Sequence, residues 1–422
     1  MGARTFGIAA LIASVAFALA ACSTPVSPTL RPTDLPSSSA ATPEPSPSPP
    51  GSTWSATDAP STEPTGAIDS PGASALPTGD GTGVIPSGTR PADTVAITKL
   101  APGERPPQFV VVSFDGACRQ SLFRHYLDLG RTTGARFTFF LAGLCIVPEA
   151  KRSLYHPPHK PVGTSAVGFA SAGNVPDRIA LMTRAYDSGH EIGTHFLGHF
   201  CDKTGVGTWS GADWASEMAQ AKYFLDHWKE INAPRGKDLR LPFDSADWKG
   251  DRTPCLQGIP SQMYPVFAKA GFTYDASSAG TLVWPQRLSG YRMWEFPLQR
   301  IKVVGYGKSN LSMDYNLLVA QNGGRTTATP AQCARIEEST YQSYTQALAA
   351  VLRGNRAPFS VGNHFNDWAC SSYTKALTRF VTDTSAKHPE VRFVTFEYLA
   401  RWLDAQDAAV LAALRAKPAP RY

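Results

Sequence analysis

The stretch Gln108-Phe-Val-Val-Val-Ser-Phe-Asp115 predicts a β-strand that ends in an aspartate. It is followed by a predicted amphipathic helix at 122–129, an apolar strand at 136–141 and a second helix at 177–188. Strands that alternate with helices in this way are typical of a parallel sheet covered by helices. The sequence therefore predicts an α/β fold.

The same alternation continues toward the C-terminus. Further strands are predicted at 191–194, 238–241, 272–275, 292–296, 359–361 and 391–395, and further helices at 212–228, 261–270, 340–352 and 397–414. A region of roughly 300 residues is long enough for one large domain or two small ones. Because no second low-complexity segment interrupts it, we predict one domain at 105–405, followed by a helix end and tail at 406–422.

The first residues have the pattern of a bacterial signal peptide. Arg4 precedes an apolar run at 6–21 that is shorter than the ~20 residues needed to span a bilayer. Leu19-Ala-Ala-Cys22 resembles the lipobox of bacterial lipoproteins. We therefore expect a lipoprotein signal peptide at 1–21 and lipid attachment at Cys22, which would place the protein outside the cytoplasm, anchored to the membrane of the cell envelope. The alternative is secretion after cleavage elsewhere, with Cys22 unmodified.

Residues 22–104 are rich in Pro, Ser and Thr, and Trp54 is their only aromatic residue. Such a segment cannot bury enough apolar surface to fold, so we predict a disordered linker that lets the domain stand away from a membrane. The formal net charge is +6, with Lys and Arg spread along the chain rather than gathered in one run. That distribution argues against a nucleic-acid partner.

Besides Cys22, the chain has six cysteines, an even number in a protein expected to face an oxidising compartment. We therefore predict three disulfides, with Cys333 paired to Cys370 and Cys201 paired to Cys255. A zinc-thiolate cluster is the competing interpretation. It is disfavoured because the sequence has no Cys-x2-Cys spacing.

Two histidines, His195 and His199, are four residues apart, a spacing that would place both imidazoles on one face of a helix. Such a pair can hold one metal ion, and an Asp with two His is a common ligand set for a hydrolytic metal. Several predicted strands end in a residue able to do chemistry: Asp115, His195, Arg240, Asp275 and His364. The carboxyl ends of strands in parallel α/β barrels meet on one face, so we expect these side chains to lie together.

Four motifs in order resemble the polysaccharide deacetylase family, also called the NodB-homology domain. Ser113-Phe-Asp-Gly116 stands where the family has Thr-Phe-Asp-Asp, and His195-Phe-Leu-Gly-His199 where it has His-Ser/Thr-x-x-His. Arg240-Leu-Pro-Phe243 matches Arg-x-Pro-Tyr/Phe, and His364 ends the strand that carries the family's last catalytic histidine. The segments 271–275, 293–297 and 355–359 resemble the chitin-deacetylase-like branch in particular. The resemblance covers nearly all of 105–405 and implies a distorted (β/α) barrel.

The resemblance also implies a reaction. A divalent metal, usually zinc, would be held by His195 and His199 and would activate water to hydrolyse an N-acetyl group. Asp115 would act as the base, with Arg240 holding its carboxylate, and a backbone N–H at Phe243 would stabilise the oxyanion. His364 would protonate the departing amine, with its pKa tuned by a carboxylate for which Asp275 is the candidate.

The chain departs from the family at the metal. Gly116 replaces the Asp that ligates the metal, and Phe196 replaces a hydroxyl residue that would brace the ligand loop. Water could fill the empty position, another carboxylate such as Asp115 or Asp202 could move in, or no metal could bind.

Each candidate residue also has a structural interpretation. Asp115 could cap a helix, Arg240 could form an ordinary ion pair, Asp275 could cap a turn, and the histidines could be packed. Trp294 and Trp368 lie near the motifs and could stack on sugar rings, although core packing is the default for tryptophan.

We therefore expect a metal-dependent hydrolase that deacetylates N-acetylglucosamine residues of an extracellular polysaccharide, either peptidoglycan or a chitin-like polymer. One alternative is a degenerate domain that has kept the barrel as a glycan-binding module of the envelope. Another is an esterase that removes O-acetyl groups at the same site.

Overall fold

The computed structural model describes residues 93, 95–234 and 239–422, all within one compact unit, Gly51–Tyr422. The predicted signal peptide, Cys22 and most of the predicted linker lie outside the described residues. Within the described part of the chain, no helix is both long and apolar enough to cross a membrane.

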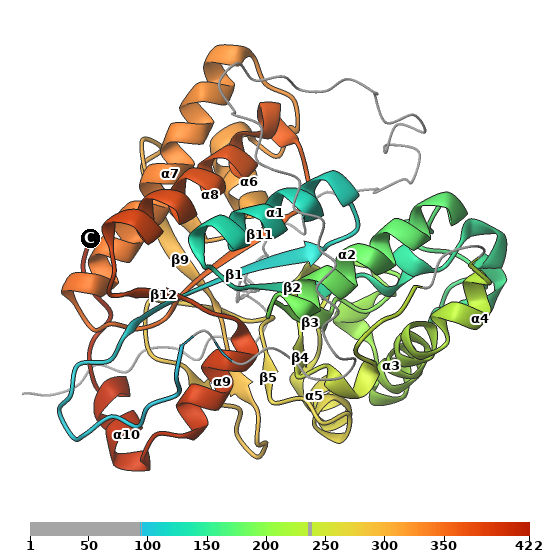
Figure 1. Cartoon of the computed structure of the whole chain (residues 1–422), viewed down its shortest axis with the longest axis horizontal. Helices are drawn as coiled ribbons and strands as arrows, with labels where there is room; N and C mark the ends of the chain where they lie inside the picture. The colour runs from blue at the N-terminus through green and yellow to red at the C-terminus, as the bar shows by residue number, and fades with distance from the viewer. Residues whose placement is uncertain (1–92, 94, 235–238) are drawn as a thin grey trace, which may run out of the picture. The chain divides into compact units, whose positions relative to one another are not determined.

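The main sheet is curled and almost entirely parallel, which confirms the predicted α/β barrel class (Figure 1). Its strand order is β11-β1-β2-β3-β4-β5-β8-β7, with β12 also paired to β1, and only β7 runs antiparallel to its neighbour. The strands are β1 (Gln108–Gly116), β2 (Phe137–Leu141), β3 (Glu191–Thr194), β4 (Gly250–Asp251), β5 (Tyr274–Asp275), β7 (Gln286–Arg287), β8 (Trp294–Glu295), β11 (Phe359–His364) and β12 (Val391–Phe393).

A smaller sheet of order β10-β9-β6 lies beside β11 and was not predicted. It consists of β6 (Ala279–Gly280), β9 (Leu298–Val303) and β10 (Lys308–Leu311). A bridge between Met313, just after β10, and Gly362 in β11 joins the two sheets. The chain then enters α6, so this sheet brings the start of α6 next to the end of β11.

Helices cover the main sheet (Figure 1). They are α1 (Gln120–Thr133), α2 (Val175–Asp187), α3 (Gly211–Asp226), α4 (Trp228–Asn232), α5 (Pro260–Lys269), α6 (Asp314–Asn322), α7 (Pro330–Arg353), α8 (Trp368–Lys387), α9 (Phe396–Asp404) and α10 (Ala408–Arg415). Helices α7 and α8 pack against each other on one flank, while α2, α3 and α4 lie on the other (Figure 1). Capping boxes start α3 at Ser210 and α7 at Thr329, where side chains satisfy the free N–H groups of the first turn.

Strand β1 is apolar along its length because both of its faces are buried. Val110, Val112 and Phe114 face one cluster of the core, whereas Phe109 and Val111 face a second cluster formed with α9 and α10. In the second cluster the ring of Phe109 lies 4.9 Å from that of Trp402. A continuous apolar run is therefore the expected pattern for this strand.

Two sequence-based expectations about elements were wrong, and one helix was not predicted. Residues 239–241 form no strand, and the position beside β3 is taken by β4, which at two residues is too short to show a period. The single helix expected at 397–414 is divided into α9 and α10. Helix α8 was not predicted, and its first turn is irregular, because Ala369, Cys370 and Ser371 have φ values of 47°, 61° and 61°.

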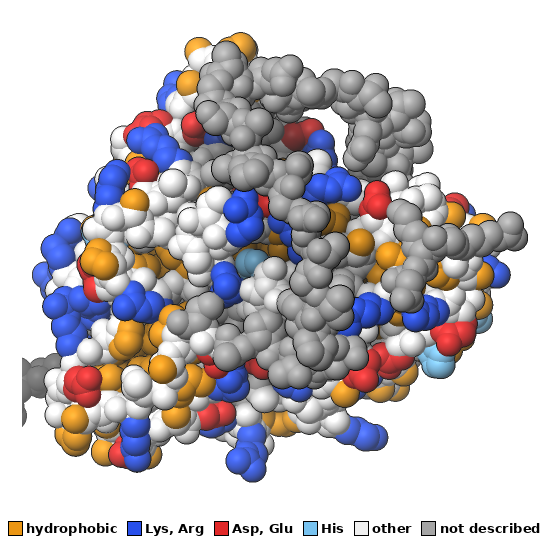
Figure 2. All heavy atoms as spheres, in the orientation of Figure 1, with side chains coloured by type: hydrophobic (Ala, Val, Ile, Leu, Met, Phe, Trp, Pro, Cys, Tyr) orange, Lys and Arg blue, Asp and Glu red, His pale blue; other side chains and the backbone are white. Residues whose placement is uncertain are grey.

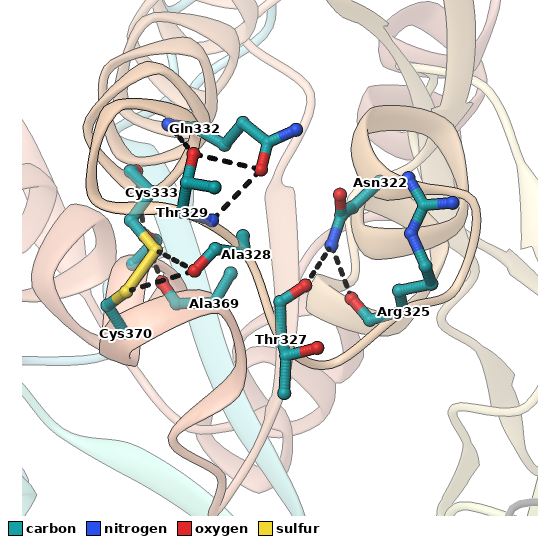
Figure 3. Close-up of a disulfide and its surroundings, with 10 residues drawn as sticks. Asn322, Arg325, Thr327, Ala328, Thr329, Gln332, Cys333, Ala369 and Cys370 are labelled. Atoms are coloured by element: carbon teal, nitrogen blue, oxygen red, sulfur yellow. Dashed lines mark hydrogen bonds between the residues drawn. A yellow bond between two sulfur atoms is a disulfide. The ribbon is translucent and has the colours of Figure 1, made fainter.

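The structure contains both predicted disulfides, Cys201–Cys255 and Cys333–Cys370, and pairs Cys118 with Cys145. Figure 3 shows how Cys333 in α7 is joined to Cys370 in the left-handed first turn of α8. The Ala369 N–H in that turn donates to the Thr326 carbonyl at 2.6 Å. The bridge and this bond hold the turn that begins at Trp368 in a conformation that non-glycine residues rarely adopt.

Candidate active site

The site is built at the carboxyl end of β1. Asp115 and His364 are register partners on the adjacent parallel strands β1 and β11, so both side chains start from the same edge of the sheet. Asp115 is 4% exposed, and a carboxylate so far from water needs a partner if it is to stay charged.

Arg252 is that partner. Its Nη1 donates to Asp115 Oδ1 at 2.8 Å and to Ser113 Oγ at 2.8 Å, while its Nε donates to the Ala276 carbonyl at 2.9 Å. The guanidinium is completely buried and lies 4.8 Å above the ring of Phe140. Burial alone would raise the pKa of Asp115, but Arg252, His195 and His364 together hold that pKa below its ordinary value. Asp115 is therefore ionised at neutral pH.

The prediction that Arg240 holds Asp115 was wrong. Arg240 is 40% exposed and lies 3.8 Å from Asp187, which is the ordinary ion pair considered as its alternative. Phe243 from the same motif packs on Tyr186 of α2, with 5.0 Å between ring centroids. Arg252-Thr-Pro254 also has the Arg-x-Pro pattern, and it directly follows a strand, which is the signal that could have identified it.

His195 and His199 lie close together, but they are not on a helix. They belong to the loop after β3, where left-handed conformations at Phe196 (φ 58°) and His199 (φ 54°) turn the chain back. The two ring centroids are 5.0 Å apart. The Nδ1–H of His195 donates to the Arg252 carbonyl at 2.7 Å, so its Nε2 keeps a free lone pair. This loop, rather than i, i+4 helical geometry, brings the two imidazoles together.

Both imidazoles are neutral at pH 7. Burial is the main cause that lowers the pKa of His195. Burial, together with His195 and His364, lowers the pKa of His199 to about 3. Neutral imidazole is the form that ligates a metal, so the pair suits two positions around a borderline cation such as zinc.

No carboxylate completes this pair within the described residues. The only group there of three metal-ligating side chains with ligand atoms within 4.8 Å of one another is His199, Cys201 and Cys255, and the two cysteines are joined in a disulfide. Asp202 is paired with Lys160 at 2.5 Å. Gly116 has φ +82°, and a Cβ built there would meet no atom within 4 Å. The two histidines fit a cation, while the position where the family has its acidic ligand is open space.

His364 is held by a carboxylate that the sequence did not reveal, Asp314 at the start of α6. Nδ1 of His364 lies 2.7 Å from Asp314 Oδ1, and the His364 backbone N–H donates to Oδ2 at 2.7 Å. Nδ2 of Asn366 donates to the same Oδ2 at 2.6 Å. Burial would lower the pKa of His364, but the charge and hydrogen bond of Asp314, with a contribution from Asp115, raise it above its ordinary value. Asp314 therefore favours the protonated form of His364.

The prediction that Asp275 partners His364 was wrong. Asp275 pairs in register with Asp251, accepts a hydrogen bond from Ser277 at 2.5 Å, and lies 3.4 Å from the hydroxyl of Tyr264 in α5. Burial raises the pKa of Asp275 to about 6. This carboxylate lies between the sheet and α5, away from His364.

Of the two candidate sugar-stacking tryptophans, Trp368 remains a candidate and Trp294 does not. Trp294 is 1% exposed, lies 4.4 Å from the Arg287 guanidinium and donates to Asp404 at 2.7 Å, so its faces are not available. Trp368 is partly exposed and its ring centroid is 5.6 Å from that of His364. Tyr315, 6.0 Å from Trp368, adds a second aromatic ring beside the histidine.

Comparison with known proteins finds similarity only among solved structures, since no family model and no curated protein matches this chain. One similar structure is described as a polysaccharide deacetylase from Mycobacterium smegmatis (14% identity, 78% of this chain and 99% of that chain, TM-score 0.45). Another is the Bc1960 peptidoglycan N-acetylglucosamine deacetylase (12%, 69% and 87%, 0.37), and a third is BA3943, a CE4 family pseudoenzyme from Bacillus anthracis (11%, 74% and 72%, 0.36). The chemistry of this chain has to be inferred from its own residues.

The two arginines give a matched test of the buried pair. Replacing Arg252 with Gln leaves the Asp115 carboxylate buried without its partner, so the free energy of unfolding should fall by about 3–5 kcal/mol. Replacing Arg240 with Gln removes only an exposed pair and should change it by less than about 0.5 kcal/mol. Denaturant titrations of both variants measure the difference, and equal losses would contradict the assignment of Arg252.

The open space at Gly116 gives a second test. Gly116→Asp should raise zinc affinity by more than about 10-fold, because a missing anionic ligand matters more than a missing hydrogen-bond partner of a ligand. The positive φ at position 116 should lower the free energy of unfolding of this variant by about 1 kcal/mol. Asp adopts this backbone conformation more readily than most other non-glycine residues. Gly116→Asn has similar backbone strain without the charge and is the control. Equal zinc affinity in the two variants would show that position 116 does not face the cation.

Proposed function

We propose that this protein is a metal-dependent hydrolase that removes acetyl groups from N-acetylglucosamine residues of an extracellular polysaccharide, either peptidoglycan or a chitin-like polymer. The observation that carries the proposal is the pairing of two opposite proton-transfer groups on neighbouring strand ends. Arg252 favours the ionised form of Asp115, and Asp314 favours the protonated form of His364. A base and an acid whose pKa values are driven apart by their surroundings are typical of a hydrolytic site.

Asp115 is the proposed base. Arg252 holds one of its oxygens and keeps the group charged, so the carboxylate can accept a proton from an attacking water. Nη2 of the same guanidinium is buried and has no hydrogen-bond partner within the described residues. The buried aromatic rings under the guanidinium exclude bulk water from this side of the site.

His364 is the proposed acid. Its Nδ1 is bonded to Asp314, which fixes the ring and leaves Nε2 to donate a proton to the departing amine. Asp314 in turn accepts from Asn366, so the carboxylate itself is held in place.

His195 and His199 would hold the metal. Two neutral imidazoles suit a divalent cation such as zinc, which would polarise the acetyl carbonyl and lower the pKa of bound water. The histidine pair itself orients such a cation, since the His195 ring is fixed by the Arg252 carbonyl. Trp368 and Tyr315 would present flat faces to a sugar ring beside His364.

The proposal includes the location of the protein. A lipid on Cys22 and the linker at 22–104 would let the domain reach a polysaccharide outside the cell while it stays attached to a membrane. On the described surface, Lys and Arg are spread over several parts of the visible face, with acidic and hydrophobic side chains between them (Figure 2). A surface of mixed charge suits contact with a wall polymer better than it suits contact with one densely charged anion.

A second candidate function is supported by one observation. Within the described residues no carboxylate joins the two histidines, which favours a degenerate domain that binds envelope glycans without hydrolysing them. Retention of the base, its arginine, the acid and its aspartate argues the other way, because binding alone needs none of them. An esterase acting on O-acetyl groups would use the same site with an easier leaving group.

Acetate release tests the proposal. The purified protein, dialysed free of metal and then supplied with zinc or cobalt, should release acetate from N-acetylglucosamine oligomers or peptidoglycan, and His195→Ala should abolish the release. O-acetylated glycans tested in parallel identify the esterase alternative. Glycan binding without release from any acetylated substrate would contradict hydrolysis and support the binding module.

The pH dependence of kcat/KM tests the acid. Asp314 raises the pKa of His364, so activity should persist above the ordinary histidine range and fall as pH rises through that raised pKa. Asp314→Asn should move this alkaline limb to lower pH and reduce kcat by roughly 10²-fold or more. Asp275→Asn is the matched control and should leave the limb in place. A limb that moves in the control, or stays in Asp314→Asn, would overturn the assignment.

A further inference from the structure

The loop that carries the two histidines is held by a buried carboxylate on a different element. Glu217 lies in the middle of α3 and is completely buried. Its Oε1 accepts the backbone N–H groups of Leu197 at 3.0 Å and Gly198 at 3.1 Å. These two residues lie between His195 and His199. One oxygen atom therefore fixes the part of the backbone that determines how the two imidazoles are placed.

Tyr155 completes this arrangement. Its hydroxyl lies 2.9 Å from Glu217 Oε2 and 3.1 Å from Oε1, and it is itself buried. It comes from the segment between β2 and α2, and it approaches Gly198 so closely that a Cβ at that glycine would lie 2.4 Å from the hydroxyl. Gly198 is therefore needed for the loop, the tyrosine and the carboxylate to meet.

Three other polar groups of the loop backbone are bonded to neutral partners. The Phe196 N–H donates to Thr194 Oγ1 at 3.0 Å, the Phe196 carbonyl accepts from Gly143 at 2.8 Å, and the Gly198 carbonyl accepts from Ala166 at 2.8 Å. Phe196 itself is buried against Trp214 of α3, so it supplies no hydroxyl to the loop. Glu217 is the ionisable acceptor in this set.

Such a loop needs strong constraint. Phe196 and His199 are both non-glycine residues with positive φ, a conformation that persists only where the surroundings determine it. A buried carboxylate is a costly means of packing a helix, and burial raises the pKa of Glu217 to about 7 despite the three hydrogen bonds that oppose the rise. An apolar residue would fill the same space more cheaply, so a specific role in holding the loop accounts better for the acid.

We propose that Glu217 is the positioning residue of the histidine loop, and that with Tyr155 it fixes Leu197 and Gly198 so that His195 and His199 can face one cation. This inference rests on the function proposed above for the two histidines. Glu217 of α3 would thus brace the histidine loop in place of a hydroxyl side chain at position 196.

Zinc affinity of the purified full chain, measured by direct titration without an activity assay, tests the inference. Glu217→Ala should weaken zinc binding by about 10–100-fold, the usual effect of removing a group that orients metal ligands. Glu217→Gln keeps an amide oxygen able to accept both N–H groups and should restore affinity to within a few-fold of the wild type. The control is Asp226→Ala, on the same helix, whose carboxylate accepts the backbone N–H of Ser245 in a loop without histidines.

A purely structural role would give a different pattern. If Glu217→Ala and Asp226→Ala change zinc affinity equally, or if Glu217→Gln binds as weakly as Glu217→Ala, the positioning role is overturned.

A measurement without metal separates this inference from the proposed function. In the wild type, the amide NMR signals of Leu197 and Gly198 should titrate together with a midpoint near the pKa of Glu217, about 7, and this titration should vanish in Glu217→Gln. Tyr155 is the titratable side chain bonded to Glu217, and burial and that carboxylate raise its pKa, so it stays neutral over this range. If the wild type binds no zinc but the amides titrate, the metal function fails and the loop contact stands. Amide signals of Leu197 and Gly198 that are the same in Glu217→Ala as in the wild type would overturn the inference even if zinc binds.

Discussion

The buried pair between Asp115 and Arg252 is the constraint on which the rest of the site depends. It joins the end of β1 to the residue after β4, two strands that are separated in the sheet by β2 and β3. Because removal of either partner would leave a charge in a nearly dry environment, the two strand ends must stay in place together. The same arginine offers its carbonyl to His195, so the pair also sets the orientation of the first imidazole.

Two further carboxylates hold the groups around this pair. Asp314 orients His364 from the start of α6, and Glu217 holds the backbone between the histidines from the middle of α3. Both supports are carboxylates, and both come from helices rather than from the strand ends. The reacting groups thus lie at the sheet edge, while the helices determine their geometry, which is how a rigid scaffold keeps a site in place without using the residues that react.

The sequence predicted the parts of this arrangement that depend on local pattern. Strand β1 is a continuous apolar run because both faces are buried, and β3 was predicted at 191–194 as observed. Strand β4 has two residues and no period, so the sequence did not reveal that Arg252 follows a strand, and Arg240 was assigned from its Arg-x-Pro motif. Asp314 is fifty positions from His364 and meets it only through a sheet that was not predicted. Nothing in the sequence around Trp294 indicated that Arg287 and Asp404 would enclose its side chain.

The three disulfides share a relation to the edge of the sheet that carries the site. Cys118 and Cys145 follow β1 and β2, Cys201 and Cys255 follow β3 and β4, and Cys370 follows β11. Five of the six cysteines therefore lie just after strands, at the edge of the sheet that carries the site, while Cys333 lies in α7. Each bridge constrains at least one segment that leaves this edge. The surroundings of the site are thus held by covalent bonds as well as by packing.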